Sequence, residues 1–363
     1  MRVCLVATEF LGWGNAGGFG FATRSLARGL SAQGIDVRVV LPQPRGTVAR
    51  RVLLDGVEVL AYQRLDIAAG TALLADANAD VYHSQEPSLG TWLAQRARPD
   101  RLHLVTSRDP RMARDWWQEL RYPTYSPLQV LRTAAYYENP PTRWAVRRAA
   151  AIYVPARFLI ERVARKYRLE TRPRFLPTPI QIPARVEKAA EPTVCFVGRL
   201  DRRKRPERFF ALAAAFPQVR FIVAGAAQDP RFAAQLARLA PPNLDQRGFV
   251  DQFAGEELSE ILGHSWVLVN TSAREGLPNS FIEACAHRCA ILSPVDPDGF
   301  ANRFGAVVED GDFVAGLHRL LDDGRWRVAG EAGYSYVVET NDFDRAVNAH
   351  IHEYQRLLAE KRL

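Results

Sequence analysis

The 363-residue sequence contains few cysteines and no long apolar segment. Of its four cysteines, only Cys285 and Cys289 lie close together, and neither a second pair nor a set of histidines accompanies them. A disulfide framework and a zinc site are therefore not expected. The apolar run at residues 3–7 is too short for a signal peptide, and no stretch approaches the roughly 18 apolar residues of a membrane span. We expect a cytoplasmic protein whose thiols are buried and reduced.

The excess positive charge of the chain is concentrated in one segment. The whole sequence has 48 Lys and Arg against 40 Asp and Glu, and residues 142–174 alone contain ten basic and two acidic side chains. Such a surplus is typical of a protein that contacts an anionic lipid surface or an acidic substrate, and also of a solvated helix face. No nucleic-acid-binding module accompanies the charge, so nucleic acid is not expected as a partner.

The alternation of short apolar runs with longer amphipathic segments predicts an α/β fold. Hydrophobic residues make up 47% and charged residues 24% of the chain, which is ordinary for a soluble globular protein. The length favours two domains, and the strand–helix rhythm restarts at residue 193 after a linker at residues 182–192. We therefore expect two doubly wound, Rossmann-like domains facing each other across a cleft, at residues 1–185 and 186–343.

Glycines dominate the loop between the first predicted strand and the first predicted helix. Gly12, Gly14 and Gly17 form a G-x-G-x-x-G pattern, which is typical of nicotinamide enzymes. Four residues separate the strand from Gly12, however, and residues 41–42 are Leu-Pro where an acidic residue should end the second strand. Gly17 and Gly18 fit better in a loop whose backbone closes over a diphosphate from the opposite domain, with a plain flexible loop as the alternative.

One stretch of the second half, residues 271–286, joins two predicted buried strands through a loop and a helix. Pro278, Asn279 and Ser280 form a strong helix start signal. The loop before them should lie at the carboxyl edge of a parallel sheet, where open α/β folds bind ligands. The N-terminus of such a helix offers free N–H groups and the positive end of a dipole to a phosphate.

Two carboxylates frame this helix start. Glu275 lies on the loop, and Glu283 lies eight residues later, inside the helix. A carboxylate accepts two hydrogen bonds at once, which suits a vicinal diol, so the stretch suits a ligand with a diphosphate between two diols. A nucleotide-sugar has this layout. Either glutamate alone would more often be solvated or placed only to favour the helix dipole.

Two cations follow the first strand of the second half. Arg199 and Lys204 stand five residues apart, after the predicted strand at residues 193–197 and ahead of a helix. Arginine supplies a forked contact and lysine a point charge, so the two can bind different phosphate oxygens. The intervening Arg202 and Arg203 are expected to be solvated.

Together these motifs resemble those of the family-4 retaining glycosyltransferases, which have the GT-B architecture. The resemblance covers nearly the whole chain, and it rests on the E-x7-E signature at residues 275–283, the Gly-Arg…Lys pattern at residues 198–204 and the Gly17-Gly18 pair. It implies transfer of a sugar from a UDP- or GDP-linked donor to an acceptor hydroxyl group with retention of the anomeric configuration. No Asp-x-Asp signature ends a predicted strand, so no metal is expected. The C-terminal helix, residues 344–363, should pack back on the first domain.

The resemblance also implies a role for each residue of these motifs. Arg199 and Lys204 would stabilise the leaving diphosphate, and Glu275 would hold hydroxyl groups of the donor sugar. The other expected donor contacts are Gly17, Gly18, Val250, Gly276, Leu277, Asn279, Ser280 and, at the ribose, Glu283. Two features depart from the family pattern: Arg205 follows the lysine where glycine is usual, and residues 287–300 lack the common Cys-Gly-x-Pro continuation.

The acceptor side of the site is expected in the first domain. His83 ends a predicted strand where many family members carry a histidine near the sugar, although a lone histidine is as often structural. Arg108 stands where the family often has another histidine, so a permanent cation replaces a titratable group. An aromatic cluster and an exposed basic helix face predict an acceptor-binding or membrane-touching surface. The cluster comprises Trp116, Trp117, Tyr122, Tyr125, Tyr136 and Tyr137, and the helix face comprises Arg162, Arg165 and Lys166.

We expect a sugar or lipid-linked acceptor, a polysaccharide or cell-envelope product, and peripheral contact with anionic membrane through residues 142–174. A GT-B epimerase or phosphorylase is one competing interpretation, and a non-catalytic nucleotide-sugar-binding partner is another. The combination of Gly-Arg…Lys with E-x7-E disfavours both. A nicotinamide enzyme is more distant, because the geometry of its fingerprint fails.

Overall fold

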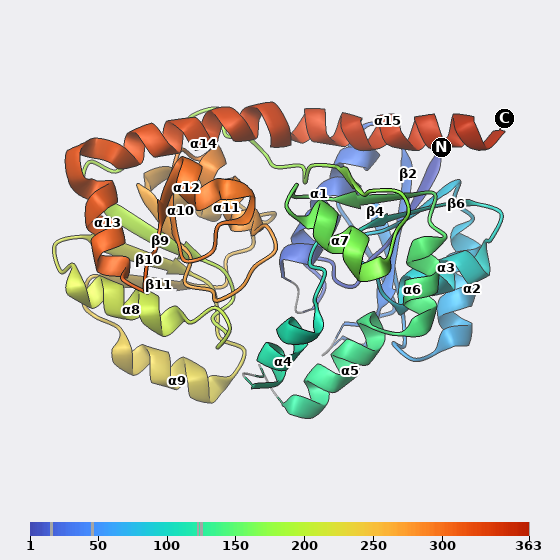
Figure 1. The fold of residues 1–363 in the computed structure, drawn as a ribbon, viewed down its shortest axis with the longest axis horizontal. Coiled ribbons are helices and arrows are strands. Elements are labelled where there is room, and N and C mark those ends of the chain that lie inside the picture. Colours follow the sequence, from blue (N-terminus) through green and yellow to red (C-terminus); the bar gives the residue numbers. More distant parts are fainter. Residues whose placement is uncertain (15–16, 45–46, 122, 124–125, 363) are drawn as a thin grey trace. The chain divides into compact units, whose positions relative to one another are not determined.

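The structure is a computed structural model, and it describes residues 1–14, 17–44, 47–121, 123 and 126–362. The chain divides into two compact units, which Figure 1 shows as ribbons. The first unit comprises Met1–Trp116, Leu128–Pro179 and Phe343–Leu363. The second unit comprises Trp117–Pro127 and Ile180–Asp342. Each unit is therefore built from separate stretches of the chain.

An eight-stranded sheet forms the centre of the first unit. Its strands are β1 (Arg2–Val6), β2 (Asp36–Pro42), β3 (Arg51–Leu54), β4 (Val57–Tyr62), β5 (Val81–Ser84), β6 (Leu102–Thr106), β7 (Ala151–Val154) and β8 (Arg174–Phe175). They lie in the order β3-β4-β2-β1-β5-β6-β7-β8, and all neighbours are parallel except the antiparallel hairpin β3–β4. The hairpin turns at Asp55 and Gly56, and both have the positive φ angles that a tight two-residue turn requires.

A parallel six-stranded sheet forms the centre of the second unit. Its strands are β9 (Thr193–Val197), β10 (Arg220–Ala224), β11 (Leu244–Gly248), β12 (Val267–Val269), β13 (Ala290–Ser293) and β14 (Gly305–Val307). They lie in the order β11-β10-β9-β12-β13-β14. The chain enters at β9, runs outward to β11, and then returns to β12 on the other side of β9. This is the course of a doubly wound sheet.

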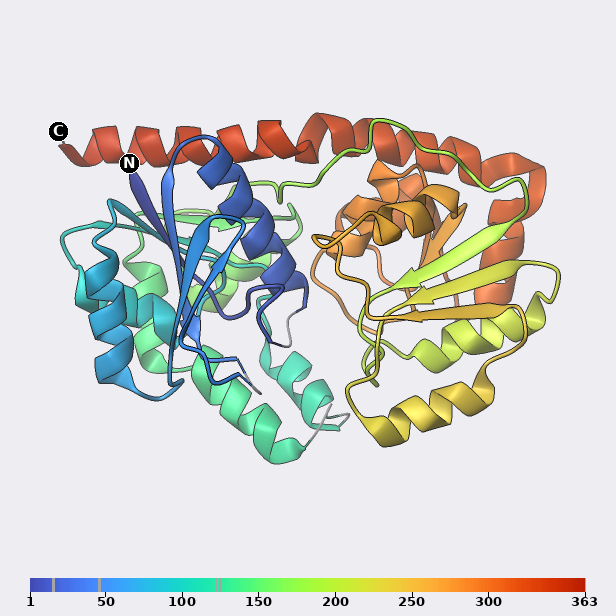
Figure 2. The same ribbon diagram turned by 180° about the vertical axis from the view of Figure 1, so that it is seen from behind.

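Helices join successive strands and flank both sheets, as the two opposite views in Figures 1 and 2 show. The first unit contains α1 (Gly18–Ala32), α2 (Ile67–Ala77), α3 (Leu89–Ala97), α5 (Pro127–Tyr137), α6 (Pro140–Arg147), α7 (Leu159–Tyr167) and α15 (Phe343–Arg362). The second contains α8 (Pro206–Ala215), α9 (Pro230–Leu239), α10 (Glu257–His264), α11 (Asn279–Ala286), α12 (Phe300–Phe304), α13 (Phe313–Leu321) and α14 (Arg325–Asn341). The unit boundary falls within α4 (Ala113–Arg121). Across the described residues, no helix has the length and apolar character needed to span a bilayer.

The central strands are continuous apolar runs because the sheets are covered on both faces. Val194, Cys195 and Phe196 of β9 are at most 2% exposed, although they point alternately to opposite faces of the sheet. The same holds for Val3, Cys4 and Leu5 of β1, which are fully buried. Continuous apolar runs of this kind made the strands recognisable in the sequence. The predicted fold class, two doubly wound Rossmann-like domains, is confirmed.

The C-terminal helix α15, drawn in red in Figure 1, completes the core of the first unit. Val347 and Tyr354 of α15 belong to the same buried apolar cluster as Val3 and Leu5 of β1. α15 also packs against α1 at Gly29, where an added Cβ would lie 2.2 Å from a methyl group of Val347. Glycine therefore permits the close approach of these two helices.

The strand orders define one switch point in each sheet, where consecutive halves of the chain run to opposite sides. In the first unit the switch point lies between β1 and β5, and in the second it lies between β9 and β12. Open α/β sheets bind ligands beyond the carboxyl ends of the strands at such points. The loops after these four strands are therefore the positions where a functional site is expected.

Candidate functional site

The loops that follow β9 and β12 carry most of the predicted site residues. The two strands are parallel neighbours, so their following loops emerge at the same edge of the sheet. The loop after β9 contains Arg199 and Lys204, and the loop after β12 contains Glu275. Three residues that lie up to 76 positions apart in the sequence are thus presented at one switch point.

Asp201 organises the loop after β9. One oxygen of its carboxylate accepts hydrogen bonds from the backbone N–H groups of Arg203 and Lys204, at 3.1 Å each. The other oxygen lies 3.3 Å from Arg203 Nη2 and 3.9 Å from Arg199 Nε. Burial raises the pKa of Asp201, but Arg203, Arg199 and Lys204 outweigh this effect and hold the pKa below its ordinary value. Asp201 was not among the predicted site residues, although a single acid within a run of cations is a signal that could have identified it.

The two cations between Arg199 and Lys204 have different environments. Arg202 is exposed, and its guanidinium group lies 4.7 Å from the centre of the Phe232 ring. Arg203 contacts Asp201 and also Glu119, whose carboxylate lies 3.3 Å from Arg203 Nη1. The prediction of a solvated side chain is therefore wrong for Arg203, because two carboxylates hold it in place.

Lys204 and Glu275 form an ion pair that joins the two loops. Their side chains are 25% and 16% exposed. Thr271 ties the same loops together by donating its hydroxyl hydrogen bond to the Lys204 carbonyl group. The sequence predicts separate contacts for the two residues, with a phosphate and with a sugar, whereas the structure pairs them. A phosphate that approached Lys204 would therefore compete with Glu275 for the ammonium group.

Helix α11 begins at Asn279, directly after Pro278, as the sequence predicts, and no side chain caps its N-terminus. Glu283 lies one turn inside the helix and is half-buried, and its carboxylate accepts no hydrogen bond from the described residues. Burial raises the pKa of Glu283 to about 7. Such a carboxyl group is suited to accept hydrogen bonds from the hydroxyl groups of a ligand. The half-buried residues around the helix start are Gly276, Leu277, Asn279 and Ser280.

The loops after β9, β10 and β11 approach one another closely. The N–H group of Gly225 donates a 2.6 Å hydrogen bond to the Gly248 carbonyl group, and that of Gly198 donates to Ala224 at 3.0 Å. A Cβ atom on Gly225 would lie 1.9 Å from the Gly198 carbonyl oxygen, so only glycine fits. Val250, a predicted donor contact, is half-buried two residues beyond the end of β11.

Arg205 has a left-handed backbone at the start of α8, with φ 50° and ψ 50°. A side chain in this region costs roughly 1–2 kcal/mol relative to glycine, which explains why glycine is usual at this position of the motif. Arg205→Gly is therefore expected to raise the free energy of unfolding by roughly 0.5–1 kcal/mol, because the relief of strain exceeds the extra flexibility of glycine in the unfolded chain. Chemical denaturation of the purified protein measures this change.

The matched control is Arg205→Ala, which removes the same side chain and keeps the backbone strain. Its stability should remain within about 0.5 kcal/mol of the wild type. An equal gain in both variants would trace the effect to the arginine side chain and contradict the backbone explanation.

His83 lies in the interior of the first unit. Its side chain is fully buried, with Nδ1 2.7 Å from the Tyr354 hydroxyl group and Nε2 2.7 Å from Thr106 Oγ1. Burial, with smaller contributions from His350 and Arg108, holds the pKa of His83 well below its ordinary value, so the ring is neutral near pH 7. Both ring nitrogens are engaged within the protein. The structure therefore does not support the predicted contact between His83 and a sugar.

Arg108 is also an interior residue, 7% exposed. Its Nη1 donates to Thr178 Oγ1 at 3.0 Å, and its Nη2 donates to Gln85 Oε1 at 2.9 Å. Burial lowers the pKa of Arg108 to about 10, so the group remains charged near neutral pH. Arg108 thus links the ends of β5 and β6 to residue 178. Its assignment to the acceptor side of the site stays a prediction.

The N-terminus of α1 is occupied by an acidic residue. Glu9 Oε2 accepts a 2.8 Å hydrogen bond from the N–H group of Gly17. The loop from the end of β1 to the start of α1 spans residues 7–17, which is too long for a dinucleotide fingerprint, in which the glycines follow the strand directly. Contact of Gly17 and Gly18 with a diphosphate stays a prediction, and in this structure Glu9 takes the Gly17 N–H group.

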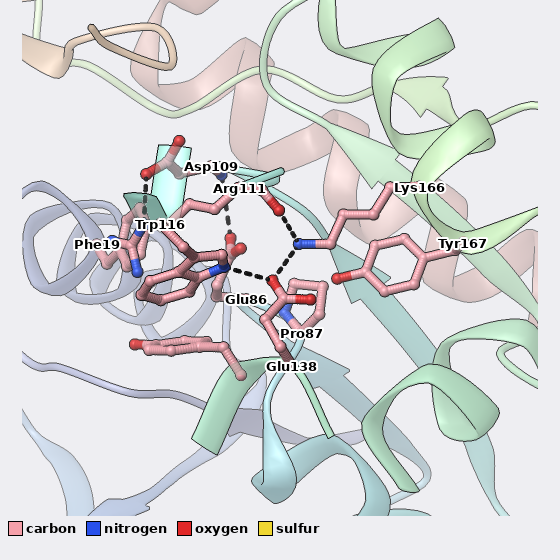
Figure 3. A pocket seen from close by; sticks show the side chains of 10 residues that line it. Phe19, Glu86, Pro87, Asp109, Arg111, Trp116, Glu138, Lys166 and Tyr167 are labelled. Carbon is pink, nitrogen blue, oxygen red and sulfur yellow. Dashed lines mark hydrogen bonds and ion pairs between the residues drawn. The ribbon is translucent and has the colours of Figure 1, made fainter. Parts of the chain in front are cut away.

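A polar pocket lies at the switch point of the first sheet (Figure 3). Glu86, in the loop after β5, is 5% exposed, and burial raises its pKa to about 7. Glu86 was not among the predicted site residues, and the position of Glu86 just after a predicted strand was the one signal for it in the sequence. The residues that line the pocket are Phe19, Glu86, Pro87, Asp109, Arg111, Trp116, Tyr137, Glu138, Lys166 and Tyr167.

The residues of the predicted aromatic cluster lie in different environments in the structure. Trp116 and Tyr137 line the polar pocket, and Tyr136 is buried with its hydroxyl group 3.2 Å from that of Tyr62. Trp117 is 69% exposed and belongs to the second unit. Among the described residues of the cluster, Trp116 and Tyr137 therefore reach the pocket. Tyr122 and Tyr125 lie outside the described residues.

Helix α7 presents only part of its charge to solvent. The side chain of Lys166 is 7% exposed and forms an ion pair with Glu138. Arg162, 27% exposed, forms an ion pair with Asp115, whereas Arg165 is exposed. The prediction of a fully exposed basic face is wrong for Lys166 and Arg162, because acidic residues of the same unit draw them inward. Contact of residues 142–174 with a membrane stays a prediction.

The described residues contain no cluster of metal-binding side chains. Within the part of the chain that the structure describes, no group of three or more His, Cys, Asp or Glu residues could hold a metal ion. All four cysteines are free and buried. The charged groups of the second switch point, Arg199, Lys204, Glu275 and Glu283, are thus the main chemical feature of that site.

Two family models match the chain, one in each half. The model described as Glycosyltransferase Family 4 matches residues 16–182, and the model described as Glycosyl transferases group 1 matches residues 191–323. Each match covers the central sheet of one unit nearly completely. No curated protein matches the sequence significantly.

Several solved structures resemble the whole chain at low sequence identity. Sucrose-phosphate synthase from Thermosynechococcus elongatus is 19% identical with a TM-score of 0.77, and the match covers 99% of this chain and 100% of that chain. Anabaena HepE in complex with UDP-glucose is 11% identical with a TM-score of 0.71, covering 97% and 100%. A mutant of S. aureus TarM in complex with fondaparinux, α-GlcNAc-glycerol and UDP is 9% identical with a TM-score of 0.68, covering 97% and 99%. At these identities the similarity establishes the fold.

Proposed function

The chain belongs to the glycosyltransferases of family 4 and group 1 with the GT-B architecture, and we propose that it is a retaining, metal-independent enzyme that transfers a sugar from a nucleoside-diphosphate donor to an acceptor hydroxyl group. One observation supports the proposal: Arg199, Lys204, Glu275 and the uncapped N-terminus of α11 all lie at the switch point of the second sheet. Such a site offers positive charge to a diphosphate and carboxylates to the diols beside it.

The ion pair between Lys204 and Glu275 supports an exchange of partners when the donor binds. A diphosphate carries more negative charge than one carboxylate, so it would displace Glu275 from the ammonium group of Lys204. Glu275 would then be free to accept hydrogen bonds from the hydroxyl groups of the donor sugar. Glu283, whose pKa burial raises to about 7, would accept hydrogen bonds from the ribose diol, and these would favour its ionised form.

Departure of the diphosphate is the step that the cations would accelerate. As the bond to the sugar breaks, negative charge grows on the leaving group, and Arg199, Lys204 and the N–H groups at the start of α11 would stabilise it. One such donor is typically worth roughly 3 kcal/mol. The acceptor would attack from the face that the diphosphate leaves, and a diphosphate oxygen would take its proton. This route retains the anomeric configuration without a separate base.

The proposed function also implies which donor and acceptor the protein binds. HepE was solved with UDP-glucose, and TarM with UDP and saccharide ligands. We propose a UDP- or GDP-linked donor for this chain, together with a sugar or lipid-linked acceptor of polysaccharide or cell-envelope synthesis. The basic residues of segment 142–174 that remain exposed, such as Arg148 and Arg165, would bring the enzyme to the anionic inner face of a membrane.

Binding of a nucleoside diphosphate is expected to raise the melting temperature of the protein. A ligand at 100 times its dissociation constant stabilises the native state by about 2.7 kcal/mol, which corresponds to a shift of several degrees. Thermal shift measurements with UDP, GDP, ADP and their sugar derivatives test this, and each compound that binds is then assayed for transfer and hydrolysis. The double variant Arg199→Ala/Lys204→Ala is the control, in which the shift should disappear.

The same measurements separate the alternatives. If no nucleoside diphosphate or nucleotide-sugar stabilises the protein, the proposed function fails. Stabilisation without transfer or hydrolysis would instead indicate a non-catalytic binding partner. A donor converted into its epimer, or into a sugar phosphate, would indicate an epimerase or phosphorylase.

A further inference from the structure

The polar pocket at the switch point of the first sheet contains a carboxylate that the protein leaves partly unpaired. Glu86 Oε2 accepts hydrogen bonds from the N–H groups of Arg108 at 2.6 Å and Asp109 at 3.4 Å. Oε1 has no hydrogen-bond partner among the described residues. Because Glu86 is 95% buried and lines the pocket, a ligand in the pocket is the natural partner for this second oxygen.

The cations of the pocket are already engaged by other carboxylates (Figure 3). Lys166 Nζ forms an ion pair with Glu138 and donates a 2.7 Å hydrogen bond to the carbonyl group of Arg111. The Arg111 guanidinium group lies 3.3 Å from Asp109 and 4.7 Å from the centre of the Trp116 ring. Three carboxylates therefore face two cations, so the pocket has no surplus positive charge to offer an anion.

Aromatic rings complete the pocket walls. Trp116, Tyr137 and Tyr167 line it beside the charged groups, and the indole N–H of Trp116 donates to Glu138 Oε1 at 3.2 Å. Aromatic walls with a few fixed polar groups are typical of small-molecule sites. The space among these side chains is about 230 Å³, a figure that includes the region open to solvent. The pocket therefore suits a hydroxyl group at the edge of a sugar ring, with most of the ring outside it.

Other buried polar atoms near Glu86 also lack partners. Gln85 Nε2, Ser107 Oγ and Arg108 Nε are all buried without a hydrogen-bond partner. They come from the ends of β5 and β6, the strands whose following loops carry Glu86 and Asp109. Folded proteins leave few such atoms, so their concentration at one sheet edge is typical of a functional site.

We propose that this pocket receives a hydroxyl group of a neutral, polyhydroxylated ring of the acceptor, that Glu86 accepts the hydrogen bond of this hydroxyl group, and that the pocket disfavours rings carrying phosphate or carboxylate. The inference rests on the proposed glycosyltransferase function and narrows its acceptor class. A neutral hydroxyl group gives Glu86 the donor it lacks. An anionic substituent would add negative charge beside Glu86, with Arg111 and Lys166 already neutralised.

Binding of such a ring should depend on pH through Glu86. Burial raises the pKa of Glu86 to about 7, and the charge of Asp109 also raises it. The Arg108 N–H group, Lys166 and Arg111 lower the pKa of Glu86 and offset part of this effect. The ionised fraction, which is the stronger hydrogen-bond acceptor, rises about tenfold from pH 6 to pH 8. Affinity for a neutral ring should rise with it. The remaining ionisable groups of the pocket are Tyr137, Glu138 and Tyr167.

Saturation-transfer NMR with the full chain tests the proposal. The probes are D-glucose, D-mannose, D-galactose and N-acetyl-D-glucosamine, each paired with its own 6-phosphate, with and without UDP. At least one neutral sugar should bind about tenfold more tightly at pH 8 than at pH 6. Glu86→Gln should weaken this binding about tenfold and abolish its pH dependence. The 6-phosphate of the same sugar should bind the wild type at least about tenfold more weakly than the neutral form.

The matched control is Glu170→Gln, which neutralises an exposed carboxylate of the same unit and should leave every affinity unchanged. If Glu86→Gln does not fold, the pH dependence of the wild type decides the question. The proposal is overturned by neutral-sugar binding that is insensitive to Glu86→Gln or to pH, by a 6-phosphate that binds as tightly as its neutral form, or by no neutral probe binding. A failure of the proposed glycosyltransferase function would give a different result from a failure of this inference, because nucleoside diphosphates would then leave the melting temperature of the protein unchanged.

Discussion

Replacement of Lys204 by alanine is expected to reduce sugar transfer by about 100-fold, and at least tenfold, while the second unit stays folded. Lys204 pairs with Glu275 in the structure and with the leaving diphosphate in the proposed mechanism. Loss of one such donor costs roughly 3 kcal/mol of transition-state stabilisation, which corresponds to a factor on the order of 100 in rate. The variant would also leave Glu275, 16% exposed, without its cation. Steady-state kinetics should therefore show a fall in kcat, with circular dichroism unchanged.

Arg202→Ala is the control within the same loop. Arg202 carries the same charge two residues earlier, but it is exposed and contacts the Phe232 ring, so its removal should change the rate by no more than about twofold. Arg199→Ala and Glu275→Ala should each lower transfer at least about tenfold. Near-normal activity in any of these three site variants would remove that residue from the mechanism.

Gly225→Ala is expected to destabilise the protein by roughly 2–3 kcal/mol. The new Cβ atom would lie 1.9 Å from the Gly198 carbonyl oxygen. A backbone atom cannot rotate away as a side chain can, so the loop that begins at Gly198 and carries Arg199 would have to shift. The substitution should therefore also weaken donor binding. Chemical denaturation measures the stability, and titration of the stabilising nucleotide measures the binding.

Gly255→Ala provides the comparison for this effect. Gly255 lies in the same unit, has an ordinary backbone conformation, and has no atom within 4 Å of the position of an added Cβ. Its replacement should change stability by no more than about 0.5 kcal/mol. If the two glycine variants proved equally stable, the close approach of Gly225 and Gly198 would not exist in solution.

The donor side of the site was largely predictable from the sequence. Arg199, Lys204 and Glu275 follow apolar strands, and the doubly wound course brings the ends of such strands to one edge. Pro278 likewise marked the start of α11 correctly. The ion pair between Lys204 and Glu275 was not predictable, because it depends on the conformation of two loops that sequence patterns do not specify.

The acceptor side was predicted less well, because side-chain direction decides it. His83 and Glu86 both lie at the end of β5, yet His83 turns into the core and Glu86 lines a pocket. The partner of His83 is Tyr354, which is 271 residues away in the sequence. The sequence predicted a solvated Lys166, whereas in the structure Lys166 forms an ion pair with Glu138. Contacts over such separations require the tertiary structure, and no local pattern encodes them.

The division of the first unit into separate stretches has a consequence for the order of events during protein synthesis. The apolar cluster of this unit includes Val347, Tyr354 and Leu357, which belong to α15. All stretches of the second unit are translated before that helix. The first unit begins to be synthesised before the second, but its core can be completed only after the second unit has been synthesised. An interrupted or truncated chain would expose this incomplete core, including the pocket for Tyr354 beside His83, to chaperones and proteases.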